Sequence, residues 1–286
     1  MRFDRRYAVN CSLVLAGRRL EEQLAQVIAA GFGAVEFWWP FSEPDPDQLA
    51  VNRFIDAVRQ SDLRLVGLNV FAGDMPAGER GVLSIPGRER ELASSVEVAA
   101  EIGAALKCTV FNALYGRRVA DLAVAEQYEH ALVTLVATAR TLEQVGTVVL
   151  EPLSGVPDYP LKTAAEVVEV IGSARDRGVG NVGLLLDVFH LASNGGDVAA
   201  DIAAFRHDIA HVQLADAPGR GAPGSGTLPL DSWLADLIDG GYAGAVALEF
   251  TSQSPEPLIG LSLPAVEPGE TRGDMSEDAG SSETTP

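Results

Sequence analysis

Short apolar runs alternate with longer amphipathic segments along most of the chain. The amphipathic segments repeat apolar residues at helical spacing, and the short runs are rich in residues that favour strands. Alternation of this kind is typical of βα units that build a parallel sheet. The predicted strands are Tyr7–Leu13, Ala34–Trp39, Arg64–Val70, Leu106–Leu114, Thr147–Leu153, Val182–His190, Ala210–Asp216 and Gly244–Phe250. The predicted helices are Leu20–Ala30, Pro46–Gln60, Glu89–Ala104, Asp121–Val145, Thr163–Arg175, Val198–Ile209 and Leu230–Asp239.

Several predicted strands are apolar at consecutive positions, as in Val148-Val149-Leu150 and Leu184-Leu185-Leu186. Strands that are covered on both faces have this pattern, which is common in parallel sheets. Eight such strands with seven helices between them predict an α/β fold, a closed (β/α)8 TIM barrel, rather than an open doubly wound sheet. No Gly-x-Gly-x-x-Gly motif follows the first strand, which removes the main reason to expect a dinucleotide-binding fold. We therefore expect residues 1–250 to form one barrel domain.

Two segments interrupt the alternation. Ala72–Gly87 is rich in Gly and Pro and follows the third predicted strand, where a barrel carries a loop that covers its site. From about Thr251 the pattern ends, and residues 251–286 hold seven acidic side chains against one basic residue, Arg272. We expect this acidic Pro/Gly/Ser-rich tail to be largely disordered. The eighth helix of the barrel is then short or missing.

Composition excludes several classes of partner. The chain has 286 residues, with 21 basic against 40 acidic side chains and a formal charge of −19. Phosphate backbones and anionic membranes both require concentrated positive charge, so neither is an expected partner. Cys11 and Cys108 lie in apolar runs, which disfavours a disulfide framework. No segment resembles a signal peptide or membrane span, so the predicted location is the cytoplasm, and homo-oligomerisation stays open.

Four polar residues stand at the ends of apolar strands five to eight. Glu151 follows Val148-Val149-Leu150, Asp187 follows Leu184-Leu185-Leu186, and Gln213 and Glu249 hold the same place in the last two strands. Their separations of 36, 26 and 36 residues each approximate one βα unit. In a barrel these strand ends converge on one mouth. Carboxylates crowded there repel each other unless a cation neutralises them, and all-oxygen ligands suit Mg2+ or Mn2+ better than Zn2+.

The strings around these positions resemble the hydroxypyruvate isomerase family of xylose-isomerase-like barrels. In the C-terminal half of the chain, the resemblance rests on six sequence motifs. They are Glu151-Pro152-Leu153, Leu186-Asp187-Val188-Phe189-His190, the run from His211 to Arg220, Pro223-Gly224-Ser225-Gly226, Gly241-Tyr242-Ala243-Gly244 and Leu248-Glu249-Phe250. In the N-terminal half it rests on Ala34-Val35-Glu36-Phe37-Trp38-Trp39-Pro40 and the loop Phe71–Gly87. The similarity covers about Arg2–Thr251. The sequence departs from the family pattern after Arg220, where Gly221-Ala222 stands in place of a His-Glu pair that is frequent in the family.

The resemblance implies a divalent metal, Mg2+ or Mn2+, held by Glu151, Asp187, Gln213 and Glu249. It also implies that Glu151 and Glu249 donate and accept the proton in an aldose–ketose isomerisation. Related epimerases have histidine where this chain has Gln213, which favours hydroxypyruvate isomerase, and the substrate would be a small hydroxy-carbonyl acid or sugar. His190 is a candidate for binding a substrate hydroxyl or a metal-bound carboxylate, against a loop or capping role. Arg220 is a candidate for binding a substrate carboxylate or hydroxyl, against a solvated loop arginine.

Other interpretations stay open on the sequence alone. The same proton transfer serves an isomerase of a larger sugar acid, such as 2-oxo-tetronate, or a ketose 3-epimerase. A less favoured class is phosphodiester hydrolysis as in endonuclease IV, which needs several histidines and a basic face. A barrel that binds sugar without catalysis is the remaining class. Glu36 and Asn69 also end strands near the mouth, and His211 fits either a packed core or a functional role.

Overall fold

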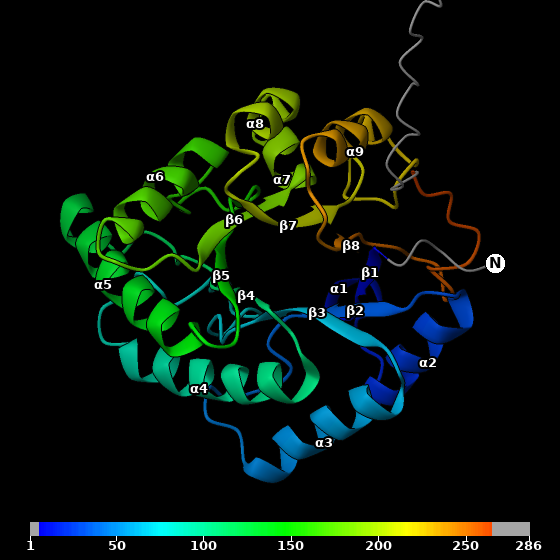
Figure 1. Ribbon diagram of the computed structural model, residues 1–286, viewed down its shortest axis with the longest axis horizontal. Helices are drawn as coiled ribbons and strands as arrows, with labels where there is room; N and C mark the ends of the chain where they lie inside the picture. Colours follow the sequence, from blue (N-terminus) through cyan, green and yellow to red (C-terminus); the bar gives the residue numbers. More distant parts are fainter. Residues whose placement is uncertain (1–5, 265–286) are drawn as a thin grey trace, which may run out of the picture.

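Eight parallel strands close into a barrel in the computed structural model, which describes residues 6–264 (Figure 1). Each strand pairs with the next along the chain, and β1 pairs with β8 through Tyr7 opposite Val246 and Val9 opposite Leu248. The predicted (β/α)8 fold is therefore confirmed. The strands are β1 (Tyr7–Asn10), β2 (Ala34–Phe37), β3 (Arg64–Asn69), β4 (Val110–Asn112), β5 (Thr147–Leu150), β6 (Val182–Asp187), β7 (Ile209–Leu214) and β8 (Val246–Leu248).

A ring of helices surrounds the barrel (Figure 1). The helices between strands are α2 (Leu20–Ala30), α3 (Gln48–Gln60), α4 (Glu89–Leu106), α5 (Val124–Leu142), α6 (Ala164–Arg175), α8 (Val198–Phe205) and α9 (Leu230–Asp239). Several begin at a side chain that accepts the hydrogen bond of an otherwise unsatisfied N–H group. Asp47 accepts from the backbone N of Ala50 at 2.7 Å, and Thr163 forms a capping box with Glu166. Local sequence thus fixes where these helices begin.

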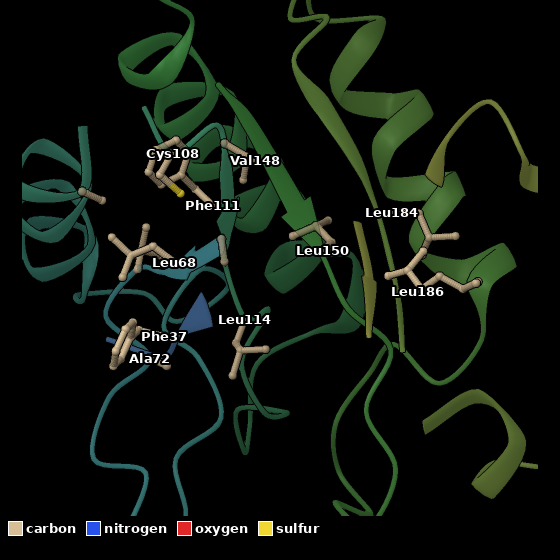
Figure 2. Close-up of a cluster of buried hydrophobic side chains, with 14 of the residues drawn as sticks. Phe37, Leu68, Ala72, Cys108, Phe111, Leu114, Val148, Leu150, Leu184 and Leu186 are labelled. Atoms are coloured by element: carbon tan, nitrogen blue, oxygen red, sulfur yellow. The ribbon is translucent and has the colours of Figure 1, made fainter. Parts of the chain in front are cut away.

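The two faces of each strand have different surroundings. Val148, Leu150, Leu184 and Leu186 belong to the large core that also contains the buried helix residues (Figure 2). The alternate positions face the inside of the barrel, where Ala8, Ala34 and Ala247 form a separate small cluster. Two residues further along the same face stand Asn10, Glu36 and Glu249. Because alternate residues of a strand face the same side, these polar side chains lie in the mouth of the barrel, above the layer of alanines.

The first and sixth strands were predicted to be too long, because the residues at their C-terminal ends form short helices. Residues 11–13 belong to α1 (Cys11–Val14), which begins where Asn10 Oδ1 accepts from the backbone N of Leu13 at 3.1 Å. Residues 188–190 belong to α7 (Val188–Ser193), with Asp187 at its N-cap. Apolar runs of this length do not distinguish strand from buried helix, so a capping side chain decides the transition.

The other boundaries also shorten the predicted strands. The helix before the fourth strand extends to Leu106, and Lys107 ends it in a left-handed conformation, so β4 holds only three residues. The eighth strand likewise covers 246–248 rather than 244–250. Parallel strands in a barrel pair over short stretches, while the apolar residues that flank them pack in connecting loops.

No helix follows β8 among residues 249–264. Leu258 is 3% exposed and packs into the core, and two hydrogen bonds tie this segment to the N-terminal part of the barrel. Arg18 Nη2 donates to the carbonyl of Pro255 at 2.7 Å, and the Tyr7 hydroxyl donates to the carbonyl of Pro264 at 2.8 Å. This irregular segment takes the place of the eighth helix, which the sequence predicted to be short or missing. Residues 265–286, with most of the predicted tail, lie outside the described residues.

Cys11 and Cys108 are both buried free thiols, in agreement with the sequence prediction. Among the helices of residues 6–264, none is both long and apolar enough to cross a membrane.

Candidate active site

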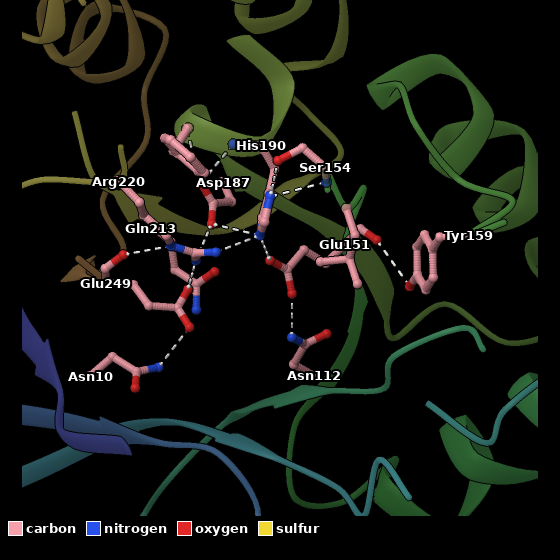
Figure 3. A network of polar contacts seen from close by, with 12 residues as sticks. Asn10, Asn112, Glu151, Ser154, Tyr159, Asp187, His190, Gln213, Arg220 and Glu249 are labelled. Atoms are coloured by element: carbon pink, nitrogen blue, oxygen red, sulfur yellow. Dashed lines mark hydrogen bonds and ion pairs between the residues drawn. The ribbon is translucent and has the colours of Figure 1, made fainter. Parts of the chain in front are cut away.

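Four strand-end residues meet at the mouth of the barrel. Glu151, Asp187, Gln213 and Glu249 are each 5% exposed or less, and Figure 3 shows them grouped around Arg220. The cavity above them has a volume of about 520 Å³, and its lining includes Glu151, Glu249, His190 and Arg220. The structure therefore brings together the four side chains that the sequence spacing placed at one mouth.

Asp187 divides its two carboxylate oxygens between local structure and the site. Oδ1 accepts from the backbone N atoms of Phe189 and His190 at 2.9 and 3.1 Å, which caps α7. Oδ2 instead accepts from Arg220 Nη2 at 2.9 Å. The cap fixes the carboxylate plane, so the second oxygen faces the centre of the site.

Arg220 is engaged by protein groups rather than solvated. Nη2 lies 2.9 Å from both Asp187 Oδ2 and Glu249 Oε2, and Nε donates to the Glu249 carbonyl at 3.0 Å. Nη1 lies 2.8 Å from His190 Nε2, and the guanidinium stacks 5.3 Å from the ring centroid of Phe189. The arginine thus holds two of the site's carboxylates together, which sequence analysis did not anticipate.

The loop that carries Arg220 is organised around a buried carboxylate. Asp216, which is 1% exposed, accepts from the backbone N atoms of Gly224, Gly226 and Leu228 at 2.9 to 3.0 Å. Asp216 also pairs with Gly221 through reciprocal backbone hydrogen bonds, so Arg220 stands at the end of a tight hairpin. The glycine N–H groups that could suggest a phosphate cradle are occupied by this carboxylate.

His190 lies on α7 and not at the end of a strand. It is 6% exposed, and its Nδ1 lies 3.0 Å from the backbone N and 2.7 Å from Oγ of Ser154. Its Nε2 faces the site, 3.6 Å from Asp187 Oδ2 and 3.7 Å from Glu151 Oε1. Burial lowers the pKa of His190 to about 4, so the ring is neutral near pH 7.

A second network lies directly beneath these residues and was only partly anticipated. Glu36 is 2% exposed and accepts hydrogen bonds from Asn10 Nδ2 at 2.7 Å and from Gln213 Nε2 at 2.6 Å. Its other oxygen contacts His211 Nε2. Burial opposes ionisation of Glu36, but the His211 ring and the amide donors outweigh it and lower its pKa. Glu36 is therefore a carboxylate.

Gly67 leaves the space that Glu36 occupies. A Cβ atom at Gly67 would lie 2.6 Å from Glu36 Oε2, closer than such atoms approach. This close approach explains a glycine inside β3, where glycine otherwise weakens a strand.

Gln213 is oriented by Glu36. Because Gln213 Nε2 donates to Glu36, its Oε1 points away, and this buried atom has no hydrogen-bond partner among the described residues. A buried amide oxygen without a donor is rare in proteins. Gln213 Oε1 is therefore available to bind a cation.

Three further side chains orient the two glutamates. Asn112 Nδ2 donates to Glu151 Oε2 at 2.9 Å, and Trp38 Nε1 donates to Glu249 Oε1 at 2.7 Å. Asn10 Nδ2 reaches the same Glu249 oxygen at 3.3 Å. Asn10 and Asn112 also end strands, so the signal that selected the later four residues applies to the first four strands as well.

The two glutamates have raised pKa values. Burial is the main cause for both, and it raises the pKa of Glu249 to about 8 although the Arg220 guanidinium acts in the opposite direction. The pKa of Glu151 is raised well above its usual range by burial and by the charges of Glu249 and Asp187. Without added positive charge, burial therefore favours the protonated form of both carboxyl groups.

The residues present suit a hard divalent cation. Ligand atoms of Glu151, Asp187 and His190 lie within 4.8 Å of one another. Gln213 Oε1 adds an unsatisfied oxygen nearby, and a single guanidinium compensates three buried carboxylates. Oxygen-rich sites of this kind favour Mg2+ or Mn2+.

Comparisons with known proteins agree with the fold. Residues 24–267 match the family model described as xylose isomerase-like TIM barrel. A Streptomyces coelicolor protein with a provisional hydroxypyruvate isomerase name is 42% identical over 253 residues, covering 86% of this chain and 91% of the relative. The hydroxypyruvate isomerase of Escherichia coli is 27% identical over 87% of this chain and 94% of its own length.

Two further comparisons extend the range of relatives. The 2-oxo-tetronate isomerase of Haemophilus influenzae is 29% identical, covering 90% of this chain and 96% of that protein. A crystal structure titled AP endonuclease, family 2, from Brucella melitensis superposes with a TM-score of 0.78 at 28% identity, covering 88% of this chain and 95% of that one.

Proposed function

The chain belongs to the hydroxypyruvate isomerase family of xylose isomerase-like TIM barrels, and we propose that it interconverts hydroxypyruvate and tartronate semialdehyde. The observation that carries this proposal is the pair Glu151 and Glu249, two buried carboxyl groups that line one cavity from the ends of β5 and β8, three strands apart around the barrel. Burial raises the pKa of both groups, which favours a carboxyl group that can hold a proton and donate it to the substrate.

The reaction moves one proton between adjacent carbon atoms. A carboxylate removes a proton from C3 of hydroxypyruvate, and the electron pair of that C–H bond forms the C2–C3 double bond of an enediolate. The electron pair of the C2 carbonyl moves onto O2, which carries the negative charge of the enediolate. A carboxylic acid then returns a proton to C2, the C3 hydroxyl loses its proton as C3 becomes the aldehyde carbon, and O2 takes up a proton to become the new hydroxyl. We assign these roles to Glu151 and Glu249, which exchange as acid and base when the reaction runs in reverse.

Other side chains hold this pair ready. Asn112 and Trp38 each donate to one of the glutamates and leave the second carboxylate oxygen directed into the site. Neutral His190 and Arg220 line the same cavity, within reach of substrate oxygens. Fixed donors of this kind lower the cost of orienting charge during proton transfer.

Glu151, Asp187, Gln213 and Glu249 would hold the divalent cation that the family implies. When bound, Mg2+ or Mn2+ would supply positive charge that stabilises the enediolate and favours ionised glutamates. In the structure the Arg220 guanidinium lies between Asp187 and Glu249, so this side chain and a cation would compete for the same two carboxylates.

Conservative variants of the two glutamates test the assignment. Glu151→Gln and Glu249→Gln should each lower kcat on hydroxypyruvate by at least about 1,000-fold, because an amide cannot exchange the proton. Circular dichroism and thermal unfolding should show a folded barrel. Turnover in deuterated water, followed by NMR, should show solvent deuterium in the product of the wild-type protein alone. Near-normal activity of both variants would contradict the proposal.

A larger sugar acid is the second candidate substrate. A neighbouring cavity of about 510 Å³ shares Trp38, Asn69, Met75 and Pro76 with the main one and adds three aromatic residues, Trp39, Phe41 and Phe71. A three-carbon acid does not need this space, whereas a longer polyol chain could pack on aromatic rings. Comparing kcat/KM for hydroxypyruvate, 2-oxo-tetronate and several ketoses would rank these substrates.

Phosphodiester hydrolysis is disfavoured by the site. One solved structure similar to this chain has an endonuclease title, but the described cluster that could hold a metal includes a single histidine, His190. His130 lies on α5 and His207 follows α8, both away from the mouth. A protein of charge −19 also repels nucleic acid. Nicking of abasic DNA at low salt would overturn this conclusion.

A cytoplasmic location and a homo-oligomeric state stay predictions. Cell fractionation and light scattering would test them.

A further inference from the structure

A substrate with a carboxylate needs a cation that the structure leaves available. Three of the five charged or ionisable site residues are acidic, so a free carboxylate placed among Glu151, Asp187 and Glu249 would be repelled. Arg220, which the sequence suggested for this role, already directs its guanidinium toward Asp187, Glu249 and His190. Even with Nη2 released, its Nε remains bonded to the Glu249 backbone.

Arg80 is the other cation that lines the main cavity. The lining residues include two arginines, Arg80 and Arg220, and a neutral His190, but no lysine. Arg80 enters from the loop between β3 and α4, whereas Arg220 comes from the loop between β7 and α9. The two arginines therefore reach the cavity from different sides of the barrel.

Arg80 is anchored by one nitrogen and open at the others. Nη1 donates to the carbonyls of Met75 and Glu79 at 2.9 and 2.6 Å. Nε and Nη2 have no acceptor within residues 6–264, and no carboxylate there forms an ion pair with this side chain. A guanidinium with a free Nε–Nη2 edge presents two parallel N–H groups, which match the two oxygens of a carboxylate.

The loop around Arg80 is held in a defined shape. The backbone N of Gly81 donates to the carbonyl of Ala72 at 2.8 Å, and a Cβ atom at Gly81 would lie 2.0 Å from the carbonyl oxygen of Leu114. Gly81 also has a φ of +101°, which favours glycine. Glu79 binds Arg88 at 2.7 Å and ties the loop to the start of α4. The position of Arg80 is thus fixed before any ligand binds.

We propose that Arg80 binds the carboxylate of the substrate and thereby selects 2-oxo acids over neutral ketoses of the same length. This inference rests on the proposed function, because it assigns the acid group of that substrate to one side chain. Arg80 holds the non-reacting end, while Glu151 and Glu249 act on the adjacent carbons. Binding at a group outside the reacting bonds restricts how those carbons can lie.

The test measures binding and turnover separately. Arg80→Gln removes the charge, Arg80→Lys retains it without the planar fork, and Arg117→Gln is the matched control. Arg117 also donates to a carbonyl of the same loop, that of Gly78 at 3.0 Å, but it does not line the cavity. Tartronate, an unreactive dicarboxylate, is titrated by calorimetry into each Mn2+-loaded protein. Inhibition of hydroxypyruvate turnover by dihydroxyacetone reports on a neutral ligand.

We expect Arg80→Gln to weaken tartronate binding and raise KM for hydroxypyruvate by about 10- to 100-fold, the usual range for a lost charge-assisted pair. Arg80→Lys should lie between this variant and the wild type. Inhibition by dihydroxyacetone should change less than about threefold in all variants, and Arg117→Gln should behave as wild type.

Failure of this inference and failure of the proposed function give different results. If the wild type binds tartronate but does not isomerise hydroxypyruvate, the proposed function is wrong and the calorimetric comparison still tests Arg80. If the wild type isomerises hydroxypyruvate and Arg80→Gln binds tartronate normally, the role of Arg80 is overturned. Equal losses for tartronate and dihydroxyacetone, or no tartronate binding by the wild type, would also overturn it.

Discussion

Single side chains in this site are useful because a neighbour fixes which of their atoms faces inward. An amide can present either an oxygen or an NH2 group, and only the oxygen can bind a cation. Glu36 accepts from Gln213 Nε2 and so turns Gln213 Oε1 toward the other ligand candidates. Glu36 itself is held as a carboxylate by His211 and Asn10. Glu36, which lies beneath the site, thus decides that Gln213 presents its oxygen, the atom that can bind a cation.

Glu36→Gln should weaken the binding of Mn2+ by about 10-fold or more. The new amide offers one acceptor oxygen in place of two, so the Gln213 amide is free to rotate and present its NH2 group. Isothermal titration calorimetry on the metal-free protein would measure the change.

A double-mutant cycle provides the control for this prediction. Gln213→Leu removes the proposed ligand oxygen, and Glu36→Gln in that background should lower Mn2+ affinity no further. Additive losses would mean that Glu36 acts on the cation independently of Gln213, contrary to the orientation argument.

At the scale of the element, loops rather than strands set the geometry around the mouth. The strands end with their polar residues at one level, but Arg220 reaches them only because the segment after β7 folds back on Asp216. Arg220 has a φ of 56°, which costs a non-glycine residue some free energy. The hydrogen bonds to Asp216 offset that cost and hold the hairpin.

Asp216→Asn should lower the free energy of unfolding by about 2–4 kcal/mol, because an amide nitrogen would face backbone N–H groups that need an acceptor. Weaker placement of Arg220 should raise KM in the same variant. Urea unfolding and steady-state kinetics would measure the two effects.

Asp231→Asn is the matched control for Asp216. Asp231 is an exposed carboxylate in the first turn of α9, and its replacement should change the unfolding free energy by less than about 1 kcal/mol. Equal effects of both substitutions would mean that Asp216 does not organise the loop.

At the scale of the whole molecule, the buried carboxyl groups couple stability to pH and to cations. The folded-state pKa of Glu249 is about 8 against an ordinary value of 4.5, so the folded protein keeps a proton that the unfolded chain loses. Stability from such a group falls as pH rises between these two values. His190 acts in the opposite direction between about 4 and 6.5 because its pKa is lowered.

The metal-free protein should therefore become less stable between pH 6.5 and 8, the window in which His190 no longer compensates. The expected slope is about 1.4 kcal/mol per pH unit for each carboxyl group that remains protonated in the folded state only. Mn2+ binds ionised carboxylates, so the gain in Tm on adding it should grow across the same range. Thermal unfolding in EDTA and in Mn2+ would measure both. Glu249→Gln should flatten the slope in EDTA, and an unchanged slope would contradict the assignment.

The sequence by itself determined the barrel and which polar side chains gather at its mouth. Apolar runs at consecutive positions indicated strands covered on both faces, and the polar residue that ended each of β5 to β8 marked the mouth. These inferences succeed because the period of a strand and the order of βα units are local properties of the chain. The prediction that residues 11–13 and 188–190 belong to strands was wrong, because apolarity alone does not distinguish a strand from a buried helix.

Only the tertiary structure decided how the side chains are connected. Glu36 and Gln213 are 177 residues apart, and Arg220 meets Asp187 and Glu249 from a loop whose shape depends on Asp216. Arg80 lies in a segment that sequence analysis identified as a covering loop without selecting any residue in it. Contacts between distant segments follow from barrel closure and loop packing, and neither the spacing nor the polarity of residues along a single chain specifies them.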